Sequence, residues 1–502
     1  MLNSNRAIIN TIAQYVRTVI NVLLTLYSTR LVLNALGSED YGLYSVIAGV
    51  VSMLGFVSNA LVISTQRYLS YYHGKRDSSL LSRVFGNSLI IHIIISILLL
   101  IILYSIKDWV VINNLDIPQE RIFAARKVYI LVVLMLVLSF ITSPFRALFI
   151  ARENIVYISI IDVLDGFFKF GSAVVLTFIS YDKLVMYALF LFGVMLFNLM
   201  AFSIFALLRY EECHFPHIKE IDKKLIASLL GFASWTLYST GCVVMRTQGI
   251  AIIINKCFGV ILNASYGIAQ QVSGALVNVS QAIANALSPQ IIKAEGEGNR
   301  RRMLYLSGIE SKYAFLMLSI VSIPIVFEMP IILKLWLGNV PSFSVYFCRM
   351  IIIAALFDTL TNGLGIANQA TGNIKIYSLV FGTVKLLTLP LAIVLLKIYN
   401  NPYVIMLSFV ICELLSSMLR IVFLNKTAGL NVGTFLKNSI IPALLVALFS
   451  LFSCGIIFYL CDWKYRILIM FPVSILSSLA IFLVTMSSEE KLVFLKLINR
   501  RK

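Results

Sequence analysis

The chain has 502 residues, of which 60% are hydrophobic and only 13% charged, and its mean hydropathy is +0.92. This composition excludes a separate soluble domain, because no long stretch is polar enough to fold in water by itself. The net charge of +18 mostly reflects basic residues in the connectors on one side of the membrane. It therefore gives no support to nucleic-acid binding.

Fourteen apolar segments follow one another along the chain, and each is long enough to cross a membrane as a helix. We predict an all-α integral membrane fold, because barrel strands would alternate apolar and polar residues. The first span carries Arg17 and lacks the small-residue cleavage site of a secretory signal, so we expect it to be retained. The predicted spans are 8–36, 41–65, 84–104, 127–149, 155–180, 183–208, 225–254, 260–288, 313–335, 345–367, 374–397, 402–424, 438–461 and 466–486.

Basic residues gather in every second connector between these spans. One set of connectors and both termini hold 24 Lys and Arg residues, whereas the opposite set holds 9. Cytoplasmic connectors are the ones enriched in Lys and Arg, so we predict that both termini are cytoplasmic. This count includes Arg146 and Arg152 as residues of the connector after the fourth span.

The seven cysteines are odd in number and show no paired metal-ligand spacing. They are interpreted as small core residues. The segment "EECHFPH" places Glu211, Glu212, Cys213, His214 and His217 together, but a solvated loop beside a membrane end explains it as well as a metal site does. We therefore predict no metal and no bound cofactor.

An internal repeat divides the chain. Tyr41-Gly42 corresponds to Tyr266-Gly267, and "ARENI" at 151–155 corresponds to "ATGNI" at 370–374, at offsets of 219 to 225 residues. Repeats with an even number of spans are parallel. We predict an N-lobe of six helices at 1–208, a cytoplasmic linker at 209–224, a C-lobe of six helices at 225–424, and two further helices with a basic tail at 425–502.

Several motifs resemble those of polysaccharide flippases, the Wzx-type O-antigen transporters of the MOP superfamily, which also contains the MATE exporters. They are the Arg-bearing first span, "LGSEDYGLYS", "ARENIVY", "ASYGIA" and "LKLWLG". The resemblance covers nearly the whole chain. It implies two lobes around a central cavity, in the bacterial inner membrane, that move undecaprenyl-pyrophosphate-linked oligosaccharide to the periplasmic leaflet by alternating access. Membrane lipids and other polysaccharide-assembly membrane proteins are the further partners that it implies.

Polar residues inside the first, seventh and eighth spans are the candidate substrate contacts. Arg17 and its neighbours at spacings of three or four share one helix face, and a charge within a span needs water, a partner or a ligand. Spans 1, 2, 7 and 8 hold three arginines and no acid, which favours an anion such as pyrophosphate. Arg17 and Arg246 would then face the central axis from equivalent helices. The predicted cavity residues are Arg17, Asn21, Arg30, Arg246, Gln270, Asn278, Gln281, Lys169 and Lys385.

Intramembrane acids leave two alternatives open. Asp162, Asp165 and Asp358 are the candidates for coupling to a proton or sodium gradient, since the chain has no P-loop for ATP. They could equally serve as structural partners: Asp165 and Lys169 are spaced to neutralise each other, and either Arg17 or Arg246 could pair with a buried acid. Arg420, near a helix end, is expected to extend towards the membrane surface.

Two other function classes, a multidrug exporter and a membrane enzyme, fit the sequence less well. A MATE-type multidrug exporter fits the same fold, but exporters of cationic drugs usually place an acid in the cavity, and the first span has none. A membrane glycan polymerase or glycosyltransferase needs catalytic acids or histidines on an extracytoplasmic loop. The longest such loop, 105–126, offers Asp108, Asp116 and Glu120 but no histidine, so we predict a transporter and no enzyme.

Overall fold

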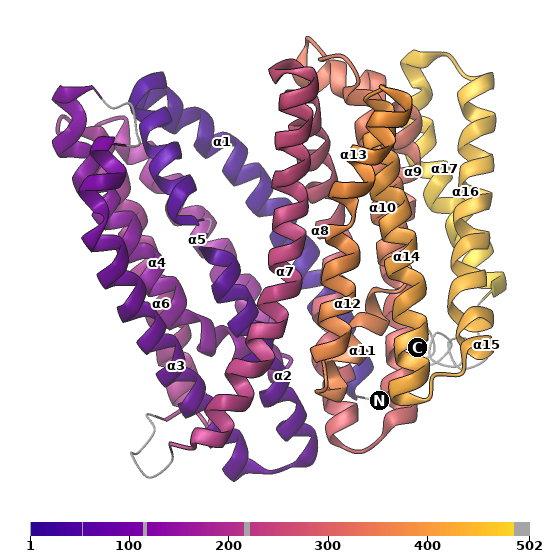
Figure 1. Cartoon of the computed structure of the whole chain (residues 1–502), viewed down its shortest axis with the longest axis horizontal. Coiled ribbons are helices and arrows are strands. Elements are labelled where there is room, and N and C mark those ends of the chain that lie inside the picture. The colour runs from indigo at the N-terminus through magenta and orange to yellow at the C-terminus, as the bar shows by residue number, and fades with distance from the viewer. Residues whose placement is uncertain (1, 53, 114–117, 215–220, 486–502) are drawn as a thin grey trace, which may run out of the picture. The chain divides into compact units, whose positions relative to one another are not determined.

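The computed structural model describes residues 2–52, 54–113, 118–214 and 221–485 (Figure 1). These residues form helices joined by short connectors, with no strand among them. Large apolar side chains such as Leu448 and Phe452 are exposed, whereas polar ones such as Glu310 and Lys312 are buried. That distribution suits a protein surrounded by lipid, and the chain is an all-α multi-pass membrane protein.

The helices form two compact units. The first unit comprises residues 1–237 and 292–298. In it α1 packs against α5, and α4 packs against α2, α3 and α6. Its helices are α1 (Leu2–Ser52), α2 (Gly55–Lys75), α3 (Ser78–Ser105), α4 (Ile122–Ala151), α5 (Ile155–Leu176), α6 (Lys183–Arg209), the first part of α7 (Lys223–Phe258) and the last turns of α8 (Val260–Gly296).

The second unit comprises residues 238–291 and 299–502. Here α14 packs against α10, α11 and α13, while α16 and α17 lie side by side against α9 (Figure 1). Beyond its parts of α7 and α8, its helices are α9 (Arg300–Leu337), α10 (Ser344–Thr359), α11 (Asn362–Thr371), α12 (Lys375–Leu386), α13 (Thr388–Tyr399), α14 (Tyr403–Ala428), α15 (Val432–Phe435), a π-helical turn (Leu436–Ile440), α16 (Ile441–Leu460) and α17 (Trp463–Thr485).

By length and hydropathy, ten helices of the described part can cross a membrane, or eleven if α10 and α11, bent by 44°, form one broken span. Most of the described residues in the spans predicted at 41–65, 155–180 and 260–288 also lie in helices, so a total of fourteen is consistent with the structure. Helix α5 is not among the ten because it carries three charged residues, Asp162, Asp165 and Lys169. The predicted break after the first span is a kink at Gly37, where φ is +78°.

Several helices extend into connectors that the sequence predicted to be loops. Lys293 lies in α8, and Arg300 to Arg302 form the first turn of α9. The assignment of Arg146 to a cytoplasmic connector is wrong, because this residue lies inside α4 and binds an acid of α5. Hydropathy alone cannot distinguish an arginine at a helix end from one that a buried carboxylate holds within the helix.

Two glycines let the ends of α2 and α8 approach closely in the first unit. A Cβ atom at Gly74 would lie well under 3.0 Å from the carbonyl oxygen of Lys293, and one at Gly296 would lie equally close to that of Tyr71. Side chains at these two glycines would therefore push the ends of α2 and α8 apart.

Candidate substrate-binding site

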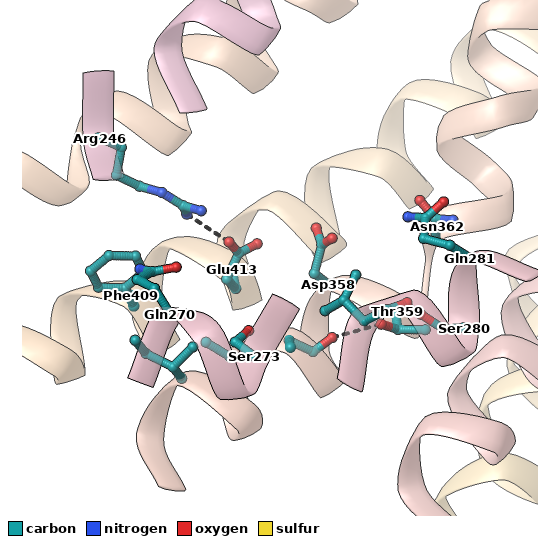
Figure 2. Close-up of a pocket in the computed structure, with 14 residues that line it drawn as sticks. Arg246, Gln270, Ser273, Ser280, Gln281, Asp358, Thr359, Asn362, Phe409 and Glu413 are labelled. Carbon is teal, nitrogen blue, oxygen red and sulfur yellow. Dashed lines mark hydrogen bonds and ion pairs between the residues drawn. The ribbon is translucent and has the colours of Figure 1, made fainter. Parts of the chain in front are cut away.

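A cavity of about 140 Å³ lies within the second unit, which is room for several water molecules. It is lined by side chains of α7, α8, α10, α11 and α14 (Figure 2). Three of the predicted cavity residues, Arg246, Gln270 and Gln281, are among them, as is the predicted coupling residue Asp358. The lining also includes Ser273, Ser280, Thr359, Asn362, Phe409 and Glu413.

Glu413 connects two cations at one side of this cavity. Figure 2 shows Arg246 reaching Glu413, whose Oε1 accepts a 2.6 Å hydrogen bond from Arg246 Nη1, and Lys385 binds the other carboxylate oxygen. The side chains of Arg246 and Glu413 are 10% and 6% exposed, so solvent screens this pair very little. The structure therefore realises the alternative in which Arg246 pairs with a buried acid.

Asp358 extends the same network. Its carboxylate lies 2.9 Å from Lys385 Nζ and 3.0 Å from Arg420 Nη2, and Arg420 also donates to the Asp358 carbonyl. The expectation that Arg420 extends towards the membrane surface is wrong, since its side chain is 5% exposed. Ion pairs join three cations to two carboxylates here, and the buried Glu310, which accepts a hydrogen bond from Asn362, also interacts with the charges of Arg420 and Asp358.

Aromatic rings and amides support these charges. Arg246 lies over the ring of Phe409 at 4.8 Å, and Lys385 and Arg420 both lie over Phe381. Cation–π contacts of this kind are strengthened away from water. On α8, Gln270 donates to the hydroxyl of Tyr266 at 2.6 Å, which orients its amide at the cavity wall.

The first unit contains a smaller cluster in which two arginines share one aspartate. Arg17 Nη1 on α1 donates to Asp162 Oδ2 on α5 at 2.6 Å, and Arg146 of α4 binds both oxygens of that carboxylate at 2.7 and 3.0 Å. Two cations share one acid, which leaves one positive charge. Next to it, Asn21 occupies the space that a Cβ at Gly166 would need, so α1 and α5 pack tightly at this level.

The remaining predicted residues divide into two groups. Asp165 and Lys169 form the expected ion pair at 2.7 Å, and Asn198 also donates to Asp165. Arg30 and Asn278 are exposed, and neither lines the cavity in the second unit. Sequence reasoning missed Arg146 because it was counted with the connector, although its position inside the predicted span 127–149 was a signal of an intramembrane charge. Phe409 and Asn362 were missed because nothing in their local sequence distinguishes them from ordinary helix residues.

A further charged cluster lies in the first unit, where α2 and α4 end. Arg152 binds Glu212 through two hydrogen bonds of 2.5 and 2.6 Å and approaches His73 Nε2 at 3.0 Å. Burial and the nearby charges of Lys293 and Arg152 lower the pKa of His73 to about 4. The described residues contain no group of three potential metal ligands, and His217 of the "EECHFPH" segment lies outside them.

Comparison with known proteins places the fold. No protein-family model matches the sequence, and no curated protein matches it. Solved structures do match: a mutant MATE protein has a TM-score of 0.75 at 12% identity, covering 85% of this chain and 96% of that one. An outward-facing multidrug resistance MATE transporter of the MOP superfamily has a TM-score of 0.73 at 13% identity, covering 84% and 95%.

A third structure is a MOP superfamily transporter from Pyrococcus furiosus, described as having a binding pocket of reverse polarity that suggests a different function. It matches with a TM-score of 0.72 at 11% identity over 86% of this chain and 96% of that one. Together these matches show that the chain has the fold of the MATE-type transporters.

Proposed function

We propose that the chain is a flippase that moves a polyprenyl-pyrophosphate-linked oligosaccharide between membrane leaflets by alternating access. The observation that carries the proposal is that, in both units, the ion-paired cations outnumber the carboxylates that bind them directly. Arg17 and Arg146 share Asp162, and Arg246, Lys385 and Arg420 share Glu413 and Asp358. A cation that is partly or fully shielded from water is stabilised by an anion, and pyrophosphate is the anion of this substrate class.

The side chains around the charges suit a glycan. Gln270, Gln281 and Asn362 offer amide donors and acceptors, and Ser273 and Ser280 offer hydroxyls, all from the wall of one cavity. Sugar hydroxyls both donate and accept hydrogen bonds, so neutral polar groups match them. The guanidinium of Arg246 can replace its bond to Glu413 by a bidentate contact with a phosphate oxygen pair.

The acids can link substrate binding to protonation. Asp162 and Asp358 each hold two cations, and Asp165 holds one. Protonation of one of these carboxylates would release its cations to the substrate, so binding of a proton and binding of the anion would favour each other. This linkage is our proposal for how the protonation of these acids controls substrate binding.

A cation-coupled multidrug exporter is the second candidate, and the fold match to a multidrug resistance MATE transporter favours it. The charge of the two clusters disfavours it, because surplus cations repel a cationic drug. In the Pyrococcus furiosus transporter, too, pocket polarity is described as suggesting a different function. Pocket charge is therefore the property that should separate the two candidates.

Depletion of the protein in its native cells tests the proposal. We expect the lipid-linked oligosaccharide to accumulate on the leaflet where it is made, measured by its resistance to an externally added glycosidase. Susceptibility to cationic drugs should not change. Normal surface polysaccharide after clean deletion, in cells without a second flippase, would contradict the proposal, and hypersensitivity to cationic drugs would favour the exporter.

A further inference from the structure

Arg420 lies at a break between two helices of the second unit. Helices α10 and α11 are bent by 44° to each other, and only Leu360 and Thr361 separate them. In a continuous α-helix the carbonyl oxygen of Asp358 would accept a hydrogen bond from the amide of Asn362. At the break this carbonyl oxygen accepts a 2.8 Å hydrogen bond from Arg420 Nη1 of α14. The guanidinium therefore lies at the carboxyl end of α10, where the helix dipole favours a positive charge.

Oxygen atoms of three kinds surround this guanidinium. Its Nη2 atom lies 3.0 Å from the Asp358 carboxylate, and Nη1 donates to the Thr361 hydroxyl at 3.4 Å as well as to the Asp358 carbonyl. Carboxylate and backbone carbonyl oxygens are the ligands that proteins use for hard metal cations. The ring of Phe381 lies 4.6 Å from the guanidinium carbon, which adds a cation–π contact. The groups around Arg420 are therefore those that stabilise a small cation.

A second acid adds negative charge beside this position. Glu310 of α9 is fully buried and accepts a hydrogen bond from Asn362, the first residue of α11. Its charge also acts on Arg420. Attraction between charges is stronger in a buried site than in water, because the local dielectric constant is lower. A cation at the break is thus favoured by Asp358 and Glu310 together, and Arg420 is a cation that the chain itself supplies.

The cavity next to Glu413 reaches the same acid. Asp358 lines this cavity, and its side chain is 36% exposed (Figure 2). Arg420 is buried and does not line the cavity. Two tethered cations nevertheless lie within 3.0 Å of the Asp358 carboxylate, namely Arg420 and Lys385. A sodium ion in the cavity would therefore meet an acid whose charge is already balanced.

We propose that Arg420 is a tethered cation that fills a binding site for a small monovalent cation at the break between α10 and α11. While the guanidinium is in place, Asp358 binds no sodium ion. Of the two gradients that the sequence leaves open, sodium is then excluded at this acid. Deletion of the guanidinium should open the site to Na⁺. The inference concerns the second unit alone and does not depend on which substrate is transported.

Thermal unfolding of the purified full chain tests this proposal in buffers that contain either NaCl or N-methylglucamine chloride at the same ionic strength. The wild type should have the same melting temperature in both. Arg420→Ala should be less stable than the wild type and should melt about 2 °C higher in NaCl than in N-methylglucamine chloride. No sodium effect is expected for Arg420→Lys, which keeps a tethered cation, or for the charge-balanced control Arg420→Ala/Asp358→Asn, which lacks the carboxylate.

Free guanidinium guards the test against loss of the fold. It is added at millimolar concentration during purification, where it can occupy the space left by the deleted side chain, and is then exchanged for either salt. If Arg420→Ala shows no sodium effect, or cannot be recovered with guanidinium although the charge-balanced control can, Arg420 is only a cap on the broken helix and the proposal is wrong. A sodium effect in the wild type that Asp358→Asn abolishes would also overturn it, and that comparison needs no substitution at Arg420.

Discussion

Arg17 and Asp162, 145 residues apart in the sequence, form a 2.6 Å ion pair between α1 and α5, and the same carboxylate is held by Arg146 from α4. One acid therefore fixes three helices of the first unit through two cations. This geometry separates two roles for Arg17, because Asp162 keeps a cationic partner when Arg17 is removed. Substitutions at Arg17 can thus be assayed for transport without leaving the half-buried carboxylate of Asp162 unpaired.

Glu413 should contribute more to stability than Asp358. Glu413→Gln leaves Arg246 and Lys385 without their shared carboxylate in a site where Glu413 is 6% exposed, and breaking a buried pair costs about 3 kcal/mol or more. The Asp358 side chain is 36% exposed, so Asp358→Asn should cost less. Melting temperatures of the purified variants in one detergent measure the difference. Equal losses of stability would show that the difference in exposure of the two carboxylates does not decide their contribution.

Gly74 should tolerate no side chain. Gly74→Val places methyl groups where the Lys293 carbonyl oxygen already lies well under 3.0 Å from the Cβ position, and overpacking of this kind costs about 2 kcal/mol. Gly296→Ala should behave similarly. Gly241→Ala, a helical position with nothing within 4 Å, is the matched control and should be neutral or slightly stabilising. A stable Gly74→Val protein would rule out the close approach of α2 and α8.

The stability of the protein should fall between pH 6.5 and pH 4 partly because of His73. Its pKa in the folded protein is about 4, against an ordinary value of 6.5. Over that interval the unfolded chain binds more protons, so stability is lost as the pH falls and is unaffected above it. His73→Gln should lose less stability than the wild type when the pH is lowered from about 7 to about 5. Parallel curves would show that His73 titrates normally.

The membrane orientation can be tested with the native cysteines. Cys257 is exposed and Cys461 half-buried, whereas Cys213, Cys348 and Cys412 are buried. An impermeant maleimide should therefore label intact cells only at 257 and 461, which the charge bias predicts to lie outside. A Lys75→Cys variant should react only after the membrane is permeabilised. Labelling at 75 in intact cells would reverse the topology.

The sequence predicted the helical class and the positions of most spans because apolar length and charge bias act locally. It also identified Arg17, Arg246 and Lys385 as intramembrane charges. It could not predict that Asp162 joins Arg17 to Arg146 or that Glu413 joins Arg246 to Lys385, because those partners are set by which helices pack together. A single sequence contains no direct signal of contacts between residues 145 or 167 positions apart.

Helix ends were harder to predict for a related reason. The basic connectors around Lys293 and Arg301 are polar, and polarity at a membrane boundary indicates a loop on average. The structure continues α8 and α9 through these residues. Their packing against α2 and the π-helical turn, through Gly296 and Gly308, stabilises helical turns that hydropathy alone does not reveal.

We expect Arg17 to act on the substrate and not only on Asp162. The charge-balanced double variant Arg17→Gln/Asp162→Asn tests this role most directly. The variant removes one cation and one acid, so the cluster keeps the single positive charge of Arg146. Transport of a fluorescent polyprenyl-pyrophosphate glycan into proteoliposomes is measured beside the wild type, Asp162→Asn, Arg17→Lys and Arg17→Glu. We predict that the double variant folds but does not transport, that Asp162→Asn, which keeps Arg17, and Arg17→Lys each keep part of the activity, and that Arg17→Glu has none. Wild-type transport by the double variant would contradict the account and leave Arg17 as a structural partner of Asp162.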